Sequence, residues 1–110
     1  MFKLNQAATF TWPVEFNLPV EGGRFEKQTF DATFKRQTSD EIKERQERDG
    51  MNDLQFCREV VTGWSGITSD GEDVPFSTAA LEQVLQVPGA AGAMVQAFYA
   101  AVSGLKRKNS

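Results

Sequence analysis

The sequence contains no histidine and only one cysteine, Cys57, among its 110 residues. A disulfide needs a pair of cysteines, and a structural zinc site needs several cysteine or histidine ligands, so one chain can form neither. The absence of imidazole also removes the usual general base of serine and cysteine enzymes. Cys57 lies on the apolar stripe of a predicted helix, so we interpret it as a small core side chain in a protein of a reducing compartment.

Long apolar runs and an excess of basic charge are missing as well. The longest uncharged stretch, Pro88 to Leu105, is shorter than the roughly 20 apolar residues that a membrane span needs. The N-terminal residues show no signal-peptide pattern. Lysine and arginine number 12 against 15 aspartates and glutamates, and the one basic cluster falls in a predicted solubilising tail, residues 106–110. We therefore expect a protein that binds neither membranes nor nucleic acid.

Residues 8–36 show the pattern of a long antiparallel β-hairpin. Every even position of the first segment is apolar: Phe10, Trp12, Val14, Phe16 and Leu18. Phe30, Ala32 and Phe34 repeat this alternation in the second segment, which predicts two strands that share one apolar face. Gly22 and Gly23 permit the positive φ angles of the connecting turn. Pro13 cannot donate a ladder hydrogen bond, so we expect the first strand at the edge of its sheet, with the missing donor outward.

Residues 38–49 are predicted to form a charged helix or linker. Thr38 and Glu41 have the spacing of a capping box. Two ion pairs at i,i+4 spacing are expected, Glu41 with Arg45 and Glu44 with Arg48. Ile42 is the only apolar residue, so the helix has no face to bury. We expect it to be exposed to solvent, to bridge other elements, or to be partly disordered on its own.

Residues 52–105 are predicted to be helical. A helix begins at Asn52 or Asp53 and runs to Thr62, with Gly63 as its C-terminal stop. Its apolar face contains Leu54, Cys57, Val61 and Trp64. After a loop around an Asp70-Gly71 turn, Ser77 or Thr78 caps a short third helix, and a fourth helix starts near Pro88 and runs to about Leu105. The chain is therefore predicted to be one α+β domain, residues 1–110, with an N-terminal β-hairpin followed by a small bundle of three to four helices.

Sites for catalysis, metals or cofactors are not recognisable in this sequence. The acidic residues Asp70, Glu72 and Asp73 lack the ligand spacing of a calcium-binding loop, and turn chemistry already explains Asp70 and Gly71. The glycines do not have the spacing of a phosphate-binding loop. We therefore predict no catalytic residue, no metal and no cofactor, and a protein that is not an enzyme.

Two apolar surfaces remain, and these are the candidate binding sites. The hairpin face carries Phe10, Trp12, Phe16, Phe30 and Phe34, and the last helix carries Met94, Phe98, Tyr99 and Val102. The simplest interpretation is that the two surfaces cover each other. The alternative is that at least one of them docks a partner protein or a second copy of the chain.

Several short segments follow one another in a recognisable order. They are Thr9-Phe10-Thr11-Trp12-Pro13-Val14, Thr29-Phe30-Asp31-Ala32-Thr33-Phe34, Gly63-Trp64-Ser65-Gly66-Ile67, Val74-Pro75-Phe76-Ser77, and Leu81-x-x-Val84-Leu85-x-x-Pro88-Gly89. This order resembles a family of short phage tail assembly chaperones of long-tailed phages or prophages. In that family a Gly-Trp-x-Gly-Ile/Val segment precedes Phe-Ser and a leucine-rich helix. The likeness spans nearly the whole chain.

The resemblance implies a function in assembly, in the cytoplasm of the bacterial host. Such chaperones bind the long helical tape measure protein, keep it soluble, help recruit tail tube subunits around it, and are absent from the finished virion. The resemblance implies no catalytic residue. The alternative prediction is a structural tail protein, a tube or connector subunit, that stays in the particle.

Overall fold

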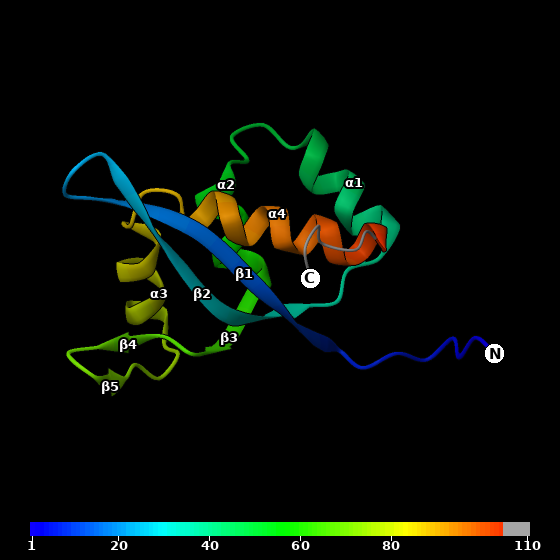
Figure 1. The fold of residues 1–110 in the computed structure, drawn as a ribbon. Coiled ribbons are helices and arrows are strands. Elements are labelled where there is room, and N and C mark those ends of the chain that lie inside the picture. The colour runs from blue at the N-terminus through cyan, green and yellow to red at the C-terminus, as the bar shows by residue number, and fades with distance from the viewer. Residues whose placement is uncertain (105–110) are drawn as a thin grey trace.

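A long β-hairpin forms the N-terminal part of the fold, as predicted. Figure 1 shows the computed structural model, which describes residues 1–104. The two strands are β1 (Thr9–Val20) and β2 (Arg24–Lys35). They pair antiparallel along their whole length, with Phe10 opposite Phe34. Gly22 and Gly23 form the turn with φ angles of 82° and 73°, a region that side chains disfavour.

β1 lies at an edge of the sheet, which confirms the interpretation of Pro13. The strand order is β1-β2-β3. The backbone N–H of Arg36 donates to the carbonyl of Ala8 at 2.8 Å, so residue 8 belongs to a hydrogen-bonded pair. Because such pairs alternate along an antiparallel ladder, the odd residues of β1 turn their backbone groups outward. Pro13 and Pro19 therefore leave two gaps in the row of donors on this open edge, which hinders pairing with another strand.

A third strand follows the second helix, and this corrects the predicted helix boundary. Helix α2 (Asp53–Val60), capped by Asn52, ends before Thr62 and is followed directly by β3 (Val61–Ser65), which pairs antiparallel with β2. Val61 and Trp64, predicted on the helix face, belong to this strand. β-branched and aromatic residues favour strands, and the inner edge of β2 offers unpaired backbone groups to them. Gly63 does not stop a helix; it lies opposite Thr33 in the ladder.

Helix α1 (Ser39–Glu47) is charged and exposed, and it bridges to α2 through contacts whose partner the sequence did not identify. The capping box of Thr38 and Glu41 is present, and none of the helix residues is fully buried. The predicted pair of Glu44 with Arg48 forms at 2.7 Å. The other predicted ion pair, Glu41 with Arg45, does not form. Glu41 instead accepts from the Thr38 N–H at 2.9 Å, and Arg45 pairs with Glu59 of α2 at 3.0 Å.

The remaining elements lie close to the predicted positions. The short strands β4 (Thr68–Ser69) and β5 (Glu72–Asp73) flank the predicted turn, where Asp70 and Gly71 have φ angles of 52° and 81°. The Ser77 hydroxyl accepts from the Ala80 N–H at 3.0 Å and caps α3 (Thr78–Leu85). Helix α4 (Ala90–Ser103) begins after Gly89, whose φ of 93° separates it from Pro88, so Pro88 precedes the helix rather than forming its first turn. Its predicted end at Leu105 and the predicted basic tail lie outside the described residues.

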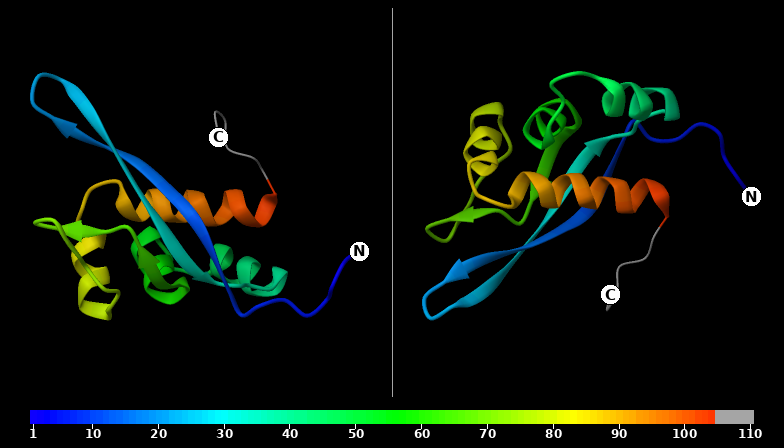
Figure 2. Two further views of the ribbon diagram at one scale, coloured as in Figure 1. Left: turned by 60° about the horizontal axis from the view of Figure 1, so that its bottom comes forward. Right: turned by 90° about the horizontal axis from the view of Figure 1, so that it is seen from above.

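Helix α4 crosses the apolar face of the hairpin and closes the core (Figure 2). Phe34 and Phe98 are both fully buried, and their ring centroids lie 5.6 Å apart. Phe98 also stands 5.1 Å from the ring of Phe56 on α2. The hairpin face and the last helix therefore cover each other in the folded chain. The fold is α+β, as predicted: a hairpin extended by a third strand and packed against the helices.

Candidate protein-binding surface

The residues predicted on the last helix fall into two groups. Met94 and Phe98 are fully buried, because they lie on the face of α4 that packs against the hairpin and α2. Val102 is 44% exposed, and Tyr99 is half-buried beside Phe56. In the folded chain, only Tyr99 and Val102 of this set can be reached by another protein.

The residues predicted on the hairpin face divide in the same way. Phe30 and Phe34 of the central strand are buried in the core. Phe10, Trp12 and Phe16 of the edge strand are half-buried and pack against the core from its side. Of the residues predicted on the two surfaces, Phe10, Trp12, Phe16 and Val102 therefore remain accessible where β1 meets α4.

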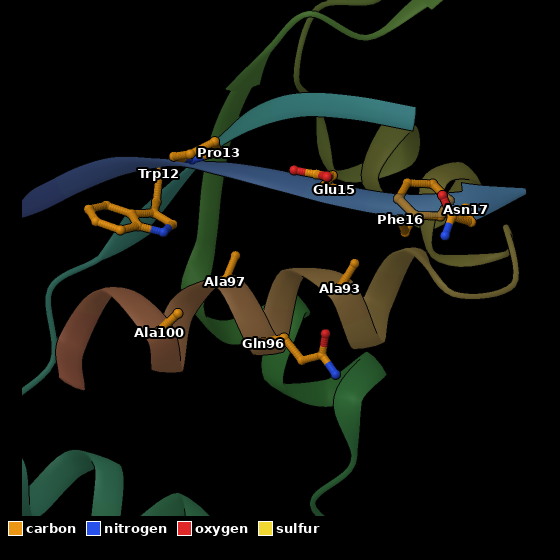
Figure 3. Close-up of a pocket in the computed structure, with 9 residues that line it drawn as sticks. All are labelled: Trp12, Pro13, Glu15, Phe16, Asn17, Ala93, Gln96, Ala97 and Ala100. Atoms are coloured by element: carbon orange, nitrogen blue, oxygen red, sulfur yellow. The ribbon is translucent and has the colours of Figure 1, made fainter. Parts of the chain in front are cut away.

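A groove runs along this junction. Figure 3 shows the Trp12 side chain pointing from β1 toward α4. The side chains of Ala93, Ala97 and Ala100 on α4 point toward the strand. The groove has a volume of about 310 Å³. The alanines of α4 are small, so the helix side of the groove is shallow. Glu15, Asn17 and Gln96 place polar groups among the apolar ones. An apolar floor with a few polar groups is typical of sites that receive another protein's side chains.

A second groove continues the first along the same junction. It measures about 250 Å³ and lies between Phe10, Arg36 and Val102, with Trp12 shared between both grooves. The Arg36 guanidinium stands 5.2 Å from the centroid of the Phe10 ring, in the geometry of a cation–π contact. The two grooves together are called the β1–α4 seam, which comprises Phe10, Trp12, Phe16, Ala93, Ala97, Ala100, Ala101 and Val102.

The indole of Trp12 differs from that of Trp64 in its hydrogen bonding. The Nε1 atom of Trp12 is shielded from solvent and has no hydrogen-bond partner among the described residues. The Nε1–H of Trp64 donates to the Val74 carbonyl at 2.8 Å. An unpaired buried donor costs free energy. Because the Trp12 indole has no hydrogen bond to offset this cost, packing alone holds it in the seam.

Reactive chemistry is not supported at Cys57. Its side chain is fully buried, its Sγ lies 3.7 Å from the Ala91 carbonyl, and burial raises the pKa of the thiol to about 12. A thiol in this state is neutral and unreactive at physiological pH. No cluster of metal-ligating side chains occurs in residues 1–104. Within the same range, no helix is long and apolar enough to cross a bilayer.

Comparison with known proteins settles the family. A family model described as phage tail assembly chaperone matches residues 1–109. The chain belongs to the phage tail assembly chaperone family. The resemblance drawn from the order of the sequence segments is thereby confirmed. No curated protein and no solved structure matches the chain.

The structure explains why this chaperone carries the Gly-Trp-x-Gly-Ile segment. Trp64 on β3 packs edge-to-face on Phe76, with ring centroids 4.9 Å apart, and its N–H bond to Val74 ties β3 to the loop before α3. Gly66, with a φ of 86°, lies against Phe30, where an added Cβ would approach the Phe30 Cα at 3.6 Å. The segment therefore holds the α3 end of the fold against the sheet.

Several residues that line the first groove were not predicted as binding residues from the sequence. The groove is lined by Ala93, Gln96, Ala97 and Ala100, because α4 lies across β1 with this side of the helix beside Trp12. The signal available in the sequence was the spacing of alanines at 93, 97 and 100, which marks one face of a helix. That spacing does not say which strand the face will meet.

Proposed function

We propose that this chain is a tail assembly chaperone that binds the phage tape measure protein through the β1–α4 seam, keeps it soluble and helps recruit tail tube subunits. Membership of the family supports the general role. The observation that carries the more specific proposal is the seam itself. It is an accessible apolar junction beside an open sheet edge in a chain without reactive groups among its described residues.

The shape of the seam suits an amphipathic helix. The alanines at 93, 97 and 100 allow close approach of a helix, while Trp12 and Phe16 offer rigid aromatic walls. A long tape measure helix has an apolar stripe that would aggregate if left bare, and a seam of this kind covers such a stripe. Val102 at the end of the seam acts as an exposed anchor.

The buried residues of the predicted site receive a supporting role in this proposal. Met94 and Phe98 would meet a partner only if α4 left the hairpin, which would expose the largest side chains of the core. We assign them to holding α4 in place, so that its alanine face stays aligned with β1. Tyr99 lies in a different pocket, beside Met51 and Phe56, and is a secondary contact candidate.

The chaperone acts by binding rather than by catalysis in this account. It works in the cytoplasm of the bacterial host while tails assemble, and it is absent from the mature virion. The neutral, buried thiol of Cys57 and the lack of histidine support a role without chemistry.

The decisive experiment is co-expression of the affinity-tagged chain with the tape measure protein of the same phage. We expect a soluble complex, and we expect the tape measure protein to be insoluble when it is expressed alone. Purified virions should contain no copy of the chain by mass spectrometry. A soluble tape measure that ignores the chain, together with the chain in mature particles, would replace this proposal with a structural tail protein.

A further inference from the structure

Among the described residues, Arg36 is the one basic side chain that lines the β1–α4 seam. It is exposed and borders the second groove, where Phe10 and Val102 form the apolar walls. Strand alternation places it there, because Arg36 follows Phe34 by two positions and so continues the side of β2 that faces α4. Lys35, next to it, projects from the opposite face of the sheet and lines neither groove.

Two contacts fix the position of the Arg36 guanidinium. Its Nε donates to the Ala7 carbonyl at 2.8 Å, and its central carbon lies 5.2 Å from the centroid of the Phe10 ring. The two Nη groups have no hydrogen-bond partner within the described part of the chain. Because the side chain is already held in one orientation, little conformational entropy is lost when its Nη groups bind an acceptor.

The charge of Arg36 is not compensated within residues 1–104, where it forms no ion pair. Other arginines of the chain do pair with glutamates, namely Arg45, Arg48 and Arg58. The other charged side chain that lines the two grooves, Glu15, pairs with Lys27 at 2.7 Å. The seam therefore presents one uncompensated positive charge, although the chain as a whole has a net charge of -3.

The chemistry of the second groove suits a carboxylate that stands beside an apolar side chain. The planar guanidinium of an arginine matches the two oxygens of a carboxylate. Around Arg36 the groove is apolar, and the N–H of Trp12 is shielded from solvent, so an incoming acceptor meets the guanidinium first. A nucleic acid would need several cations in a row, whereas the seam offers one. On an amphipathic helix, an acidic residue three or four positions from an apolar one provides both groups on one side.

From these observations we propose that Arg36 selects the segment of the partner helix that binds the seam, by pairing with a carboxylate at the border of its apolar stripe. An apolar side chain three or four positions away enters the second groove between Trp12 and Val102. A segment with the same stripe but a basic residue at that border is rejected, because like charges opposed at an interface cost free energy. The inference rests on the proposed function and adds to it the acidic residue that the bound segment must carry.

Binding of tape measure peptides to the full-length chain tests this selection. Overlapping synthetic peptides of about 25 residues, or roughly seven helical turns, cover the tape measure protein of the same phage. Fluorescence anisotropy measures their affinity, and loss of binding to Val102→Arg identifies a peptide that uses the seam. We expect this peptide to carry Asp or Glu three or four positions from a bulky apolar residue. Arg36→Gln should bind it at least about fivefold more weakly. The matched control Lys35→Gln, which removes the same charge from the other face of the sheet, should bind it as the wild type does.

A double-mutant cycle separates direct pairing from a structural effect of Arg36. Replacing the acidic residue of the peptide by its amide should weaken binding to the wild type by a similar factor, and should cause no further loss with Arg36→Gln. Arg36→Lys keeps the charge without the planar fork, so its affinity should fall between those of the wild type and Arg36→Gln.

The outcomes distinguish this inference from the proposed function. Wild-type affinity in Arg36→Gln, additive losses in the cycle, or a seam-binding peptide without an acidic residue at that border would overturn the role of Arg36 and leave the seam as the binding site. If no peptide depends on Val102, the proposed function fails, and the role of Arg36 fails with it.

Discussion

At the scale of single residues, Phe98 joins the two halves of the fold. Its ring lies within 6 Å, centroid to centroid, of Phe10 and Phe34 on the hairpin and of Phe56 on α2. No other side chain of α4 has aromatic contacts to both β-strands of the hairpin and to α2 among the described residues. Burial of the Phe98 ring therefore stabilises the packing of α4 against three elements, β1, β2 and α2.

Phe98→Ala should destabilise the fold strongly. Truncating a fully buried phenylalanine leaves a cavity and costs about 3–5 kcal/mol. Chemical denaturation should show this loss, whereas Val102→Ala, on the exposed part of the same helix, should change the free energy of unfolding by no more than about 0.5 kcal/mol. Equal effects of the two variants would mean that α4 does not pack on the hairpin as described.

The two tryptophans offer a paired test of hydrogen bonding. Trp64→Phe removes an N–H that is bonded to the Val74 carbonyl, while Trp12→Phe removes an N–H without a partner. Both changes delete the same atoms from a half-buried side chain, and only Trp64 loses a hydrogen bond. We expect Trp64→Phe to be the more destabilising, by about 1 kcal/mol in urea denaturation. The opposite order would show that Trp12 has a partner in solution.

At the scale of elements, α1 is held by charge more than by burial. The Glu59 carboxylate of α2 forms ion pairs with Arg45 at 3.0 Å and with Arg48 at 2.6 Å. Ile42 is the one half-buried apolar side chain of α1. Hydrogen bonds from Gln55, Arg48 and Arg45 lower the pKa of Glu59 to about 2 from an ordinary value of 4.5. Glu59 therefore links the position of α1 to pH.

Glu59→Gln should lower stability at neutral pH and weaken its dependence on acid. The folded state holds Glu59 ionised to a lower pH than the unfolded state does. Its contribution is therefore complete above pH 4.5 and is lost as the pH falls toward 2. Thermal melts between pH 7 and pH 2 should show a shallower decline for Glu59→Gln than for the wild type. Glu47→Gln, exposed at the end of α1, is the control and should follow the wild-type profile.

How well each element could be predicted depends on where its determinants lie. The hairpin and the cap of α3 follow from local signals, the alternation from Phe10 to Leu18 and the hydroxyl of Ser77, so the sequence sufficed. The boundary between α2 and β3 was predicted wrongly. Val60, Val61 and Trp64 fit both a helix face and a strand, and only the free edge of β2 decides between them. The partner of Arg45 likewise depends on where α2 lies.

At the scale of the whole molecule, the candidate site arises from the angle at which α4 crosses the hairpin. Residues of the predicted site divide according to that crossing: Phe34, Met94 and Phe98 face inward, while Trp12 and Val102 border the seam. The sequence predicted the apolar residues of both surfaces, but not which of them would remain accessible. That outcome depends on packing between segments about 60 residues or more apart, which no local pattern encodes.

The most direct test of the account is how much tape measure protein each variant keeps soluble during co-expression. Val102→Arg places charge and bulk at the exposed end of the seam, where the last turn of α4 tolerates a cation. The matched control, Val20→Arg, changes a residue of similar exposure, 39% against 44%, at the hairpin turn. We expect the wild type and Val20→Arg to keep the tape measure protein soluble. Val102→Arg, equally well folded, should lose at least about tenfold of the co-purified partner. Full retention by Val102→Arg, or equal loss by Val20→Arg, would contradict binding through the β1–α4 seam.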